Sequence, residues 1–417
     1  MLQEKGVGSN VGSWEGGRGD LAIVLSGGGA RAAYQAGVLR GLARHLPETR
    51  FPVVVGVSAG AINAAFIAAH PGTLFEAADE LCHLWAGLHV DNIFRLDTPL
   101  LTRSLLTWIR WATRLGSGGP LLGPEIRGLV ETEPLRDTLR AAWADVDGEI
   151  IGIERNLEQG RLKAAALITL NYSTGQTVTW VQGRHIRPWD QPQRRSVHAR
   201  LTLEHVMASS ALPFVFPAIR LGHSYYGDGG VRLSAPLSPA IRLGATRVLA
   251  ISARHEATLE EADRPQIVGY PPPAQILSHL FDAIFLDVLD EDVRRLKSLN
   301  PLIEKLPPED RNGLRPVDIR VLRPSEDLGK LSAAYEPQLP EPFRLLTRSL
   351  GTRQTTTPDV LSYLMFQPDY LEHLIRMGEA DAEARLPALR DLLEEDPAEG
   401  LQGHQGPQGQ EIPAPGP

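Results

Sequence analysis

The sequence predicts an α/β fold with a central, mainly parallel sheet. Two strand-to-helix units carry this prediction. The apolar run at 21–25 leads through glycines into a helical pattern over 30–46, and the run at 53–55 leads into a small-residue helix over 59–69. Strand, helix, strand, helix in this order is typical of parallel strands covered by their connecting helices. Later stretches with strand character lie at 164–171, 176–182, 246–252 and 317–323.

A strong amphipathic pattern predicts one long helix over 275–299, and the Pro-rich segment 300–358 is expected to be mostly connective. The ends of the chain are rich in Gly, Gln or Pro, a composition typical of disordered tails. The predicted organisation has four parts: a tail at 1–20, one large catalytic α/β domain at 21–255, a mostly helical extension at 256–385 and a polar tail at 386–417.

Composition excludes several classes of protein. The 417 residues contain 42 Lys and Arg against 50 Asp and Glu, and the net charge of −8 argues against a nucleic-acid partner. The single cysteine, Cys82, cannot form an internal disulfide bond, which favours a reducing, cytoplasmic location. Glycines and polar residues interrupt the most apolar stretch, Val53 to Ala69, so no transmembrane segment is expected. No metal-ligand spacing is recognised, and no metal or organic cofactor is implied.

The first motif with chemical content is Gly-x-Ser-x-Gly, formed by Gly56, Ser58 and Gly60 where a strand meets a helix. A serine hydroxyl is a weak nucleophile unless it is exposed, oriented and next to a base. A sharp strand-to-helix turn exposes it, and the flanking glycines permit the tight backbone. Because this motif arises often by chance, a plain small-residue turn into a packed helix explains it almost equally well.

A glycine loop, Gly27-Gly28-Gly29, precedes Ala30 and Arg31 between the first strand and the first helix. Its backbone amides are suited to holding the oxyanion of an acyl intermediate. A dinucleotide loop would place Gly at Ala32, and a Walker loop would need Gly-Lys-Ser/Thr; neither pattern is present. An ordinary Gly-rich turn is the alternative for this piece alone.

The third motif is Asp228, Gly229 and Gly230, a sequence that also suits an ordinary turn. In a dry pocket, desolvation raises the proton affinity of a carboxylate, so Asp228 is a candidate general base for Ser58.

Together these motifs resemble the patatin-like phospholipase family, in its bacterial form. A fourth block, Ala208 to Pro217, is similar to the stretch that precedes the catalytic Asp in that family. The resemblance covers roughly 21–252, with a weaker likeness over 275–376. One departure is Ala32, where the family often has Gly.

The resemblance implies a patatin-like three-layer fold and lipid acyl hydrolysis by a Ser–Asp dyad without a catalytic histidine. It implies that Ser58 is the nucleophile and Asp228 the base. The amides near Gly28 and Gly29 would form the oxyanion hole, and Arg31 would orient that loop or meet anionic charge. The expected partner is a lipid substrate.

Several alternatives remain open. A Ser–Asp–His triad that uses His255 is formally allowed by chain order. The acyl donor could be a thioester or a neutral glyceride rather than a phospholipid. From another class, the chain could be a non-catalytic lipid-binding regulator on the same fold. Acyl preference, head group and oligomeric state are not encoded in any motif.

Two basic and aromatic stretches suggest transient peripheral membrane contact. One is a candidate lid helix over 99–115, and the other runs over 180–200. A docked surface helix explains the first stretch slightly better, and a solvated loop explains the second equally well. Binding to anionic vesicles tests the hypothesis, and equal activity on dispersed and aggregated substrate without such binding would rule it out.

Overall fold

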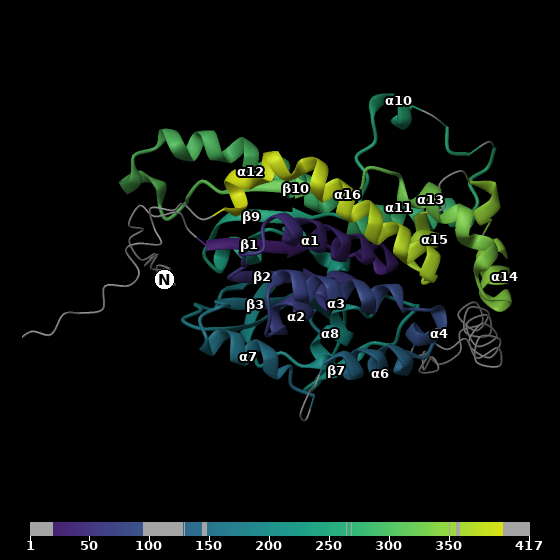
Figure 1. Ribbon diagram of the computed structural model, residues 1–417, viewed down its shortest axis with the longest axis horizontal. Helices are drawn as coiled ribbons and strands as arrows, with labels where there is room; N and C mark the ends of the chain where they lie inside the picture. Colours follow the sequence, from purple (N-terminus) through teal and green to yellow (C-terminus); the bar gives the residue numbers. More distant parts are fainter. Residues whose placement is uncertain are drawn as a thin grey trace, which may run out of the picture.

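The computed structural model describes residues 20–94, 128, 130–143, 148–263, 265–267, 269–349, 351–355 and 359–394. These residues form a ten-stranded mixed sheet with helices on both faces (Figure 1). The predicted α/β fold is therefore confirmed. The candidate lid at 99–115 lies outside the described residues. Among the described residues, none of the helices has the length and apolar character needed to cross a membrane.

The sheet has the order β10-β9-β1-β2-β3-β4-β6-β5, with β8 paired to β3 and β7 paired to β8. The five strands from β10 to β3 are parallel to their neighbours, while β4 and β8 run antiparallel to β3. The strands are β1 (Asp20–Leu25), β2 (Val53–Val57), β3 (Ala164–Asn171), β4 (Thr177–Gly183), β5 (Asp190–Gln191), β6 (Arg194–His198), β7 (Ile219–Leu221), β8 (Ser224–Asp228), β9 (Ala245–Ile251) and β10 (Asp318–Leu322).

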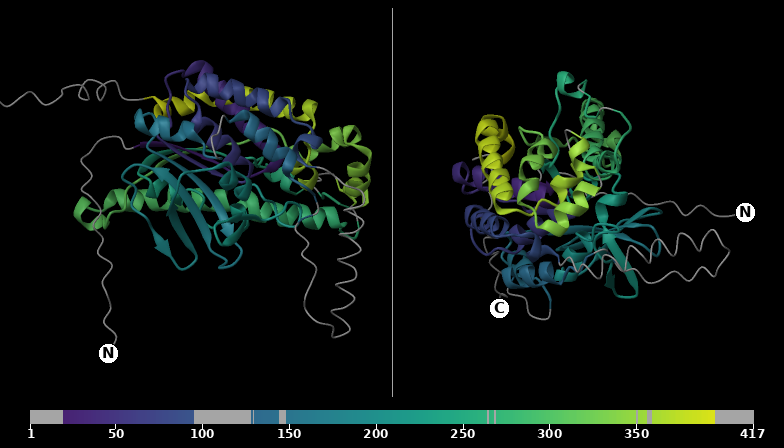
Figure 2. Two further views of the ribbon diagram at one scale, coloured as in Figure 1. Left: turned by 90° about the horizontal axis from the view of Figure 1, so that it is seen from below. Right: turned by 90° about the vertical axis from the view of Figure 1, so that its right-hand side faces the viewer.

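Strand side chains alternate between two apolar cores, as the period of two in a strand requires. In β1, Leu21, Ile23 and Leu25 belong to the larger core, whereas Ala22 and Val24 belong to the smaller one. Figure 2 shows helices on both sides of the strands. Those on the larger core are α1 (Ala33–His45), α2 (Ala59–Ala69), α3 (Leu74–Ala86), α7 (Ile151–Glu158) and α16 (Pro368–Leu393).

The smaller core is covered by α9 (Ser238–Arg242) and α12 (Asp287–Lys305). The other described helices lie at the ends of the sheet and in the connections. They are α4 (Val90–Ile93), α6 (Glu133–Ala142), α8 (Leu203–Ser209), α10 (Leu259–Ala262), α11 (Pro273–Phe285), α13 (Leu328–Tyr335), α14 (Glu341–Ser349) and α15 (Asp359–Tyr363), with 3₁₀ turns η1 (Gly29–Ala32), η2 (Gly229–Arg232), η3 (Pro308–Arg311), η4 (Glu336–Gln338) and η5 (Thr352–Gln354).

The C-terminal part differs from the prediction in three places. The helix expected over 275–299 is divided at Leu286 into α11 and α12, because α12 packs on the sheet while the end of α11 packs near the sheet's carboxyl edge. The segment 300–358 holds β10, α13 and α14 rather than mostly connections. The polar tail predicted over 386–417 is wrong at its start, since α16 continues to Leu393. Its last turns bury four leucines: Leu386, Leu389, Leu392 and Leu393.

Candidate active site

Ser58 stands at the junction of β2 and α2, in a backbone conformation that few side-chain-bearing residues adopt. Its φ of 57° lies in the left-handed region. The flanking glycines make the turn feasible: a Cβ atom on Gly56 would lie 2.5 Å from the Gly60 carbonyl oxygen, and a Cβ on Gly60 would collide with the carbonyl oxygen of Leu25. Both glycines therefore allow α2 to approach the ends of β1 and β2 closely.

The register of β3 brings Asp228 next to this turn. Val57, the last residue of β2, lies opposite Ile168, and Asp228, the last residue of β8, lies opposite the next residue, Thr169. Ser58 and Asp228, which are 170 positions apart in the sequence, thus lie at the same point of the sheet. Gly229 is required here because a Cβ on it would collide with the Ile168 carbonyl oxygen.

The Asp228 carboxyl group is completely buried. Its Oδ1 accepts a hydrogen bond of 2.8 Å from the Gly230 amide. Burial raises the pKa of Asp228 to about 7, and hydrogen bonding by the Ser58 hydroxyl and the Gly230 amide partly offsets that rise. The Ser58 hydroxyl is therefore near the carboxyl group, although no described residue makes a hydrogen bond of good geometry to Oδ2. This carboxyl group can accept a proton at neutral pH.

The raised pKa makes stability depend on pH. In the unfolded chain the carboxyl group has its ordinary pKa of 3.8. Between pH 4 and 7 the unfolded chain therefore releases a proton that the folded protein keeps, and stability falls as pH rises. We expect Asp228→Asn, which cannot ionise, to gain about 4 kcal/mol in free energy of unfolding relative to wild type between pH 4 and pH 8, at about 1.36 kcal/mol per pH unit.

Urea unfolding of the two proteins across this pH range measures the effect. Asp310→Asn is the control, because Asp310 is exposed in η3 and should not reproduce the trend. A stability difference between Asp228→Asn and wild type that stays constant with pH would show that the Asp228 carboxyl group is not desolvated.

The glycine loop lies directly against Ser58. A Cβ on Gly27 would come within 2.9 Å of the Ser58 Cβ. Gly29 has a φ of 56°, and a Cβ there would collide with the carbonyl oxygen of Tyr363. None of the described residues accepts a hydrogen bond from the amide of Gly28 or Gly29. These amides are thus available to a bound oxyanion, as an acyl-transfer site requires.

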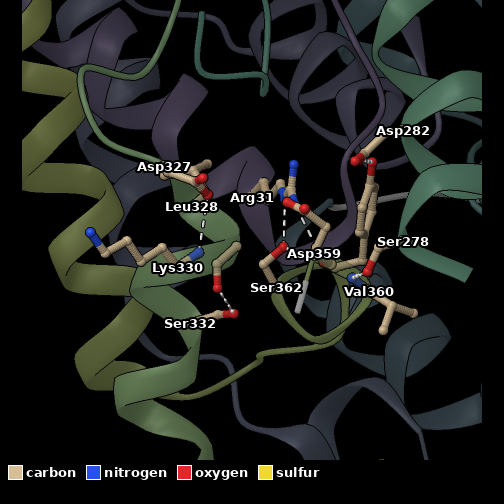
Figure 3. A network of polar contacts seen from close by, with 12 residues as sticks. Arg31, Ser278, Asp282, Asp327, Leu328, Lys330, Ser332, Asp359, Val360 and Ser362 are labelled. Carbon is tan, nitrogen blue, oxygen red and sulfur yellow. Dashed lines mark hydrogen bonds and ion pairs between the residues drawn. The ribbon is translucent and has the colours of Figure 1, made fainter. Parts of the chain in front are cut away.

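The Arg31 side chain lies against the C-terminal extension, next to Asp359 and Ser362 (Figure 3). Its guanidinium group pairs with Asp359 at 2.6 Å and donates to the Ser362 hydroxyl at 2.6 Å. It also lies over the ring of Tyr363, 4.4 Å from the centroid. Arg31 is therefore placed to hold the glycine loop against α15, while its charge is already neutralised by Asp359.

Two serines of the Ala208–Pro217 block brace the nucleophile turn, a role that the sequence interpretation did not assign. The Ser58 amide donates to the Ser209 hydroxyl at 3.0 Å, and the Ser210 hydroxyl donates to the Ser58 carbonyl oxygen at 3.1 Å. The Ser58 amide is consequently not free to hold an oxyanion. Asp359 and Ser362 were also missed, because nothing in their local sequence indicates a contact with Arg31 more than 320 residues earlier.

An apolar cavity opens beside Ser58. About 710 Å³ of empty space lies between its lining residues, including the opening to solvent. Thr138, one of few polar lining residues, donates its hydroxyl hydrogen to main-chain oxygens. Most of the remaining lining comes from α2, α3, α4, α6, the α3–α4 connection and the extension, among them Ile62, Leu84, Trp85, Leu88, Leu135, Leu139, Phe285 and Tyr363. Such a cavity accepts an alkyl chain rather than a polar group.

His255, the candidate third member of a triad, is engaged elsewhere. Its Nδ1 lies 3.0 Å from the Pro324 carbonyl oxygen, and its Nε2 lies 3.4 Å from a carboxylate oxygen of Glu261. Neither ring nitrogen contacts Ser58 or Asp228. Within the part of the chain that the structure covers, no group of three or more His, Cys, Asp or Glu side chains is arranged to hold a metal ion.

A family model described as "Patatin-like phospholipase" matches residues 23–241, more than half of the chain. No match was found among curated protein sequences. VipD from Legionella pneumophila is similar in structure with 14% identity and a TM-score of 0.34, covering 82% of this chain and 67% of that protein. Human GIVD cytosolic phospholipase A2 is similar with 12% identity and a TM-score of 0.43, covering 90% and 60%.

The same human protein in complex with methyl γ-linolenyl fluorophosphonate gives 14% identity and a TM-score of 0.41, covering 90% of this chain and 59% of that protein. The chain thus spans between 59% and 67% of the length of these proteins.

Proposed function

Since this chain belongs to the patatin-like phospholipase family, we propose that it is a lipid acyl hydrolase in which Ser58 is the nucleophile and Asp228 the general base. One observation carries the proposal. A serine in a left-handed turn lies beside a fully buried carboxyl group at the edge of an apolar cavity. The engagement of both nitrogens of His255 elsewhere favours a dyad over a triad.

The proposed reaction proceeds through an acyl-serine intermediate. Ser58 Oγ attacks the carbonyl carbon of the lipid ester while Asp228 takes the hydroxyl proton. The amides of Gly28 and Gly29 hold the oxyanion. As the intermediate collapses, the bond to the leaving oxygen breaks and Asp228 gives its proton to that oxygen. Water then attacks the acyl-serine, Asp228 takes its proton and returns one to Ser58 Oγ, and the fatty acid leaves.

Asp228 suits both halves of this cycle because a general base is most effective when its pKa lies near the working pH. Its pKa of about 7 lets the carboxylate accept a proton in one step and return it in the next. Activity is thus expected to rise with pH around neutrality, as the carboxyl group ionises.

Fatty-acid release from a phospholipid, a neutral glyceride and an acyl thioester of the same chain tests the proposal and its alternatives. We expect phospholipid hydrolysis. Faster release from the glyceride or the thioester would select one of those acyl donors. A protein that binds the lipids without releasing fatty acid from any of them would be a non-catalytic lipid-binding regulator.

The apolar cavity is proposed to hold the acyl chain, and Leu84 offers a way to test this. Leu84 is half-buried on α3 and lines the cavity. Leu84→Trp should narrow the cavity and lower kcat/KM for long-chain esters about tenfold relative to short-chain esters, since one methylene in a hydrophobic pocket changes binding by about 1–3 kcal/mol. Rates on an ester series from two to sixteen carbons measure this change.

Leu74→Trp is the matched control, because Leu74 is half-buried on the same helix but does not line the cavity. An unchanged chain-length profile in Leu84→Trp, or an equal change in Leu74→Trp, would mean that the acyl chain lies elsewhere.

A further inference from the structure

Phe285, the last residue of α11, reaches the candidate active site from outside the family-matched region 23–241. Its side chain is almost fully buried. A Cβ on Gly230 would lie 2.5 Å from Phe285 Cδ1 and 2.7 Å from Cε1, and a Cβ on Gly27 would lie 3.6 Å from Cδ1. The ring therefore occupies the space left by two glycines, Gly27 next to Ser58 and Gly230 next to Asp228.

The same ring lies next to the Asp228 carboxyl group. The Cβ that would meet the ring at Gly230 would also lie 3.2 Å from Asp228 Oδ1. In addition, Phe285 lines both the apolar cavity beside Ser58 and a smaller space bounded by Leu25, Val55 and Leu289. Phe285 thus lies between these two spaces and covers the turn from Asp228 to Gly230.

Contacts within the extension fix the ring in this place. Its centroid lies 5.8 Å from that of Phe281 and 6.1 Å from that of Tyr363. The Tyr363 hydroxyl donates to Asp282 at 3.4 Å, and Arg31 lies over the Tyr363 ring. Figure 3 shows Asp282 on one side of this network and the Arg31–Asp359 pair beside it. The extension is thereby tied to the glycine loop.

We propose that Phe285 is a positioning residue that excludes water from the Asp228 carboxyl group and so tunes it as the general base. The inference rests on the proposed function only in naming Asp228 as the base. It makes the extension part of the active site, because α11 supplies the ring that packs at Gly230 beside this carboxyl group.

The other groups that face Asp228 are uncharged at neutral pH. They are the Ser58 hydroxyl at the start of α2, the Gly230 amide from η2 and the phenol of Tyr172, an exposed residue directly after β3. Burial and the charge of Asp228 raise the pKa of Tyr172, so this phenol stays neutral. Solvent exclusion is therefore the main influence on the carboxyl group.

Charged groups on the packed elements are directed elsewhere. On α11, Asp282 contacts Tyr363. On η2, Arg232 is exposed and approaches Gly175. On α8, His205 contacts Thr202 and the ring of Trp180. Removing the Phe285 ring would let water reach Asp228 Oδ2, which has no partner among the described residues, and water would favour the ionised form.

Infrared difference titration of the protonated carboxyl band tests the inference without requiring activity. Subtracting the spectrum of Asp228→Asn isolates Asp228 from Asp282, whose pKa is also raised by burial and by the charge of Asp359. We expect a wild-type midpoint near pH 7. In Phe285→Ala the midpoint should fall by at least about one pH unit, because water then solvates the carboxylate.

Three further variants complete the design. Phe285→Met should keep the midpoint close to wild type by restoring apolar cover, and Phe285→Val should give an intermediate value. Phe281→Ala is the matched control, since Phe281 is on the same helix and in the same aromatic cluster but has no contact with Gly27 or Gly230. Melting curves establish that each variant is folded. If Phe285→Ala is not folded, the inference is tested by whether the midpoint of Phe285→Val lies below that of Phe285→Met.

Equal midpoints across the Phe285 series, or an equal fall in Phe281→Ala, would overturn the inference. Lipid hydrolysis by wild type is measured in parallel. If wild type hydrolyses lipid and the titration midpoint of Phe285→Ala is unchanged, the exclusion of water by Phe285 is refuted, and the proposed function stands. A shifted midpoint in a protein that hydrolyses no lipid refutes the proposed function and leaves the shielding of Asp228 by Phe285 intact.

Discussion

Ser58→Ala is expected to abolish fatty-acid release, with kcat/KM reduced by at least about 10³-fold, because no acyl-serine can form without the hydroxyl. The fold should survive. Ala has the same Cβ as Ser at a φ of 57°, so the substitution adds no backbone strain. Steady-state hydrolysis of a phospholipid and of a short-chain ester by purified wild type and variant measures the loss.

Ser332→Ala provides the matched control for this loss. Ser332 is a fully buried serine in α13 whose hydroxyl donates to the Gly329 carbonyl oxygen, and it does not line the cavity. It should retain nearly all activity. Residual activity of Ser58→Ala above about one tenth of wild type, in a folded preparation, would exclude Ser58 as the nucleophile.

Asp228→Asn is expected to lower kcat by about 10²–10⁴-fold with a much smaller change in KM. The amide keeps the size of the carboxyl group but cannot accept the serine proton. The reduction should be greatest above pH 7, where the wild-type carboxylate is ionised and active. Rate measurements from pH 5 to pH 9 should show a rise through about pH 7 in wild type and no such rise in the variant.

Asp292→Asn is the control for this substitution. Asp292 is another buried carboxylate that accepts a main-chain amide hydrogen bond, from Leu237, but it lies on α12 outside the cavity. Replacing this carboxylate with an amide should leave the pH profile of activity as in wild type. A normal rate for Asp228→Asn at pH 8 would contradict its role as the base and would reopen the search for a histidine.

The first two strand-to-helix units were predictable because their chemistry is local. Apolar strands ending in Gly27-Gly28-Gly29 and in Gly56 to Gly60 define both turns without reference to the rest of the chain. The Asp228 motif offered a candidate base for Ser58, and the family resemblance turned this alternative into a prediction that the two residues meet. The physical cause of that meeting is the pairing of β8 with β3, which no local pattern encodes.

The extension was less predictable because its role depends on contacts between distant segments. The pattern over 275–299 indicates an amphipathic stripe, but it does not show that the chain turns at Leu286 to direct Phe285 toward Gly230. Similarly, Asp359 has no motif around it, and its partner Arg31 lies at the other end of the chain. The hypothesis of membrane contact stays a prediction. In its second stretch, Trp180 is buried and is not available to a lipid surface.

The most direct test of the dyad is the rate at which a lipid-like fluorophosphonate modifies the protein, with the modified residue identified by peptide mass spectrometry across pH. We expect one adduct, on Ser58, with a rate that is half-maximal near pH 7 in wild type and strongly reduced in Asp228→Asn. An adduct on another residue, no adduct, or modification of Ser58 at the same rate with and without the Asp228 carboxyl group would contradict the account.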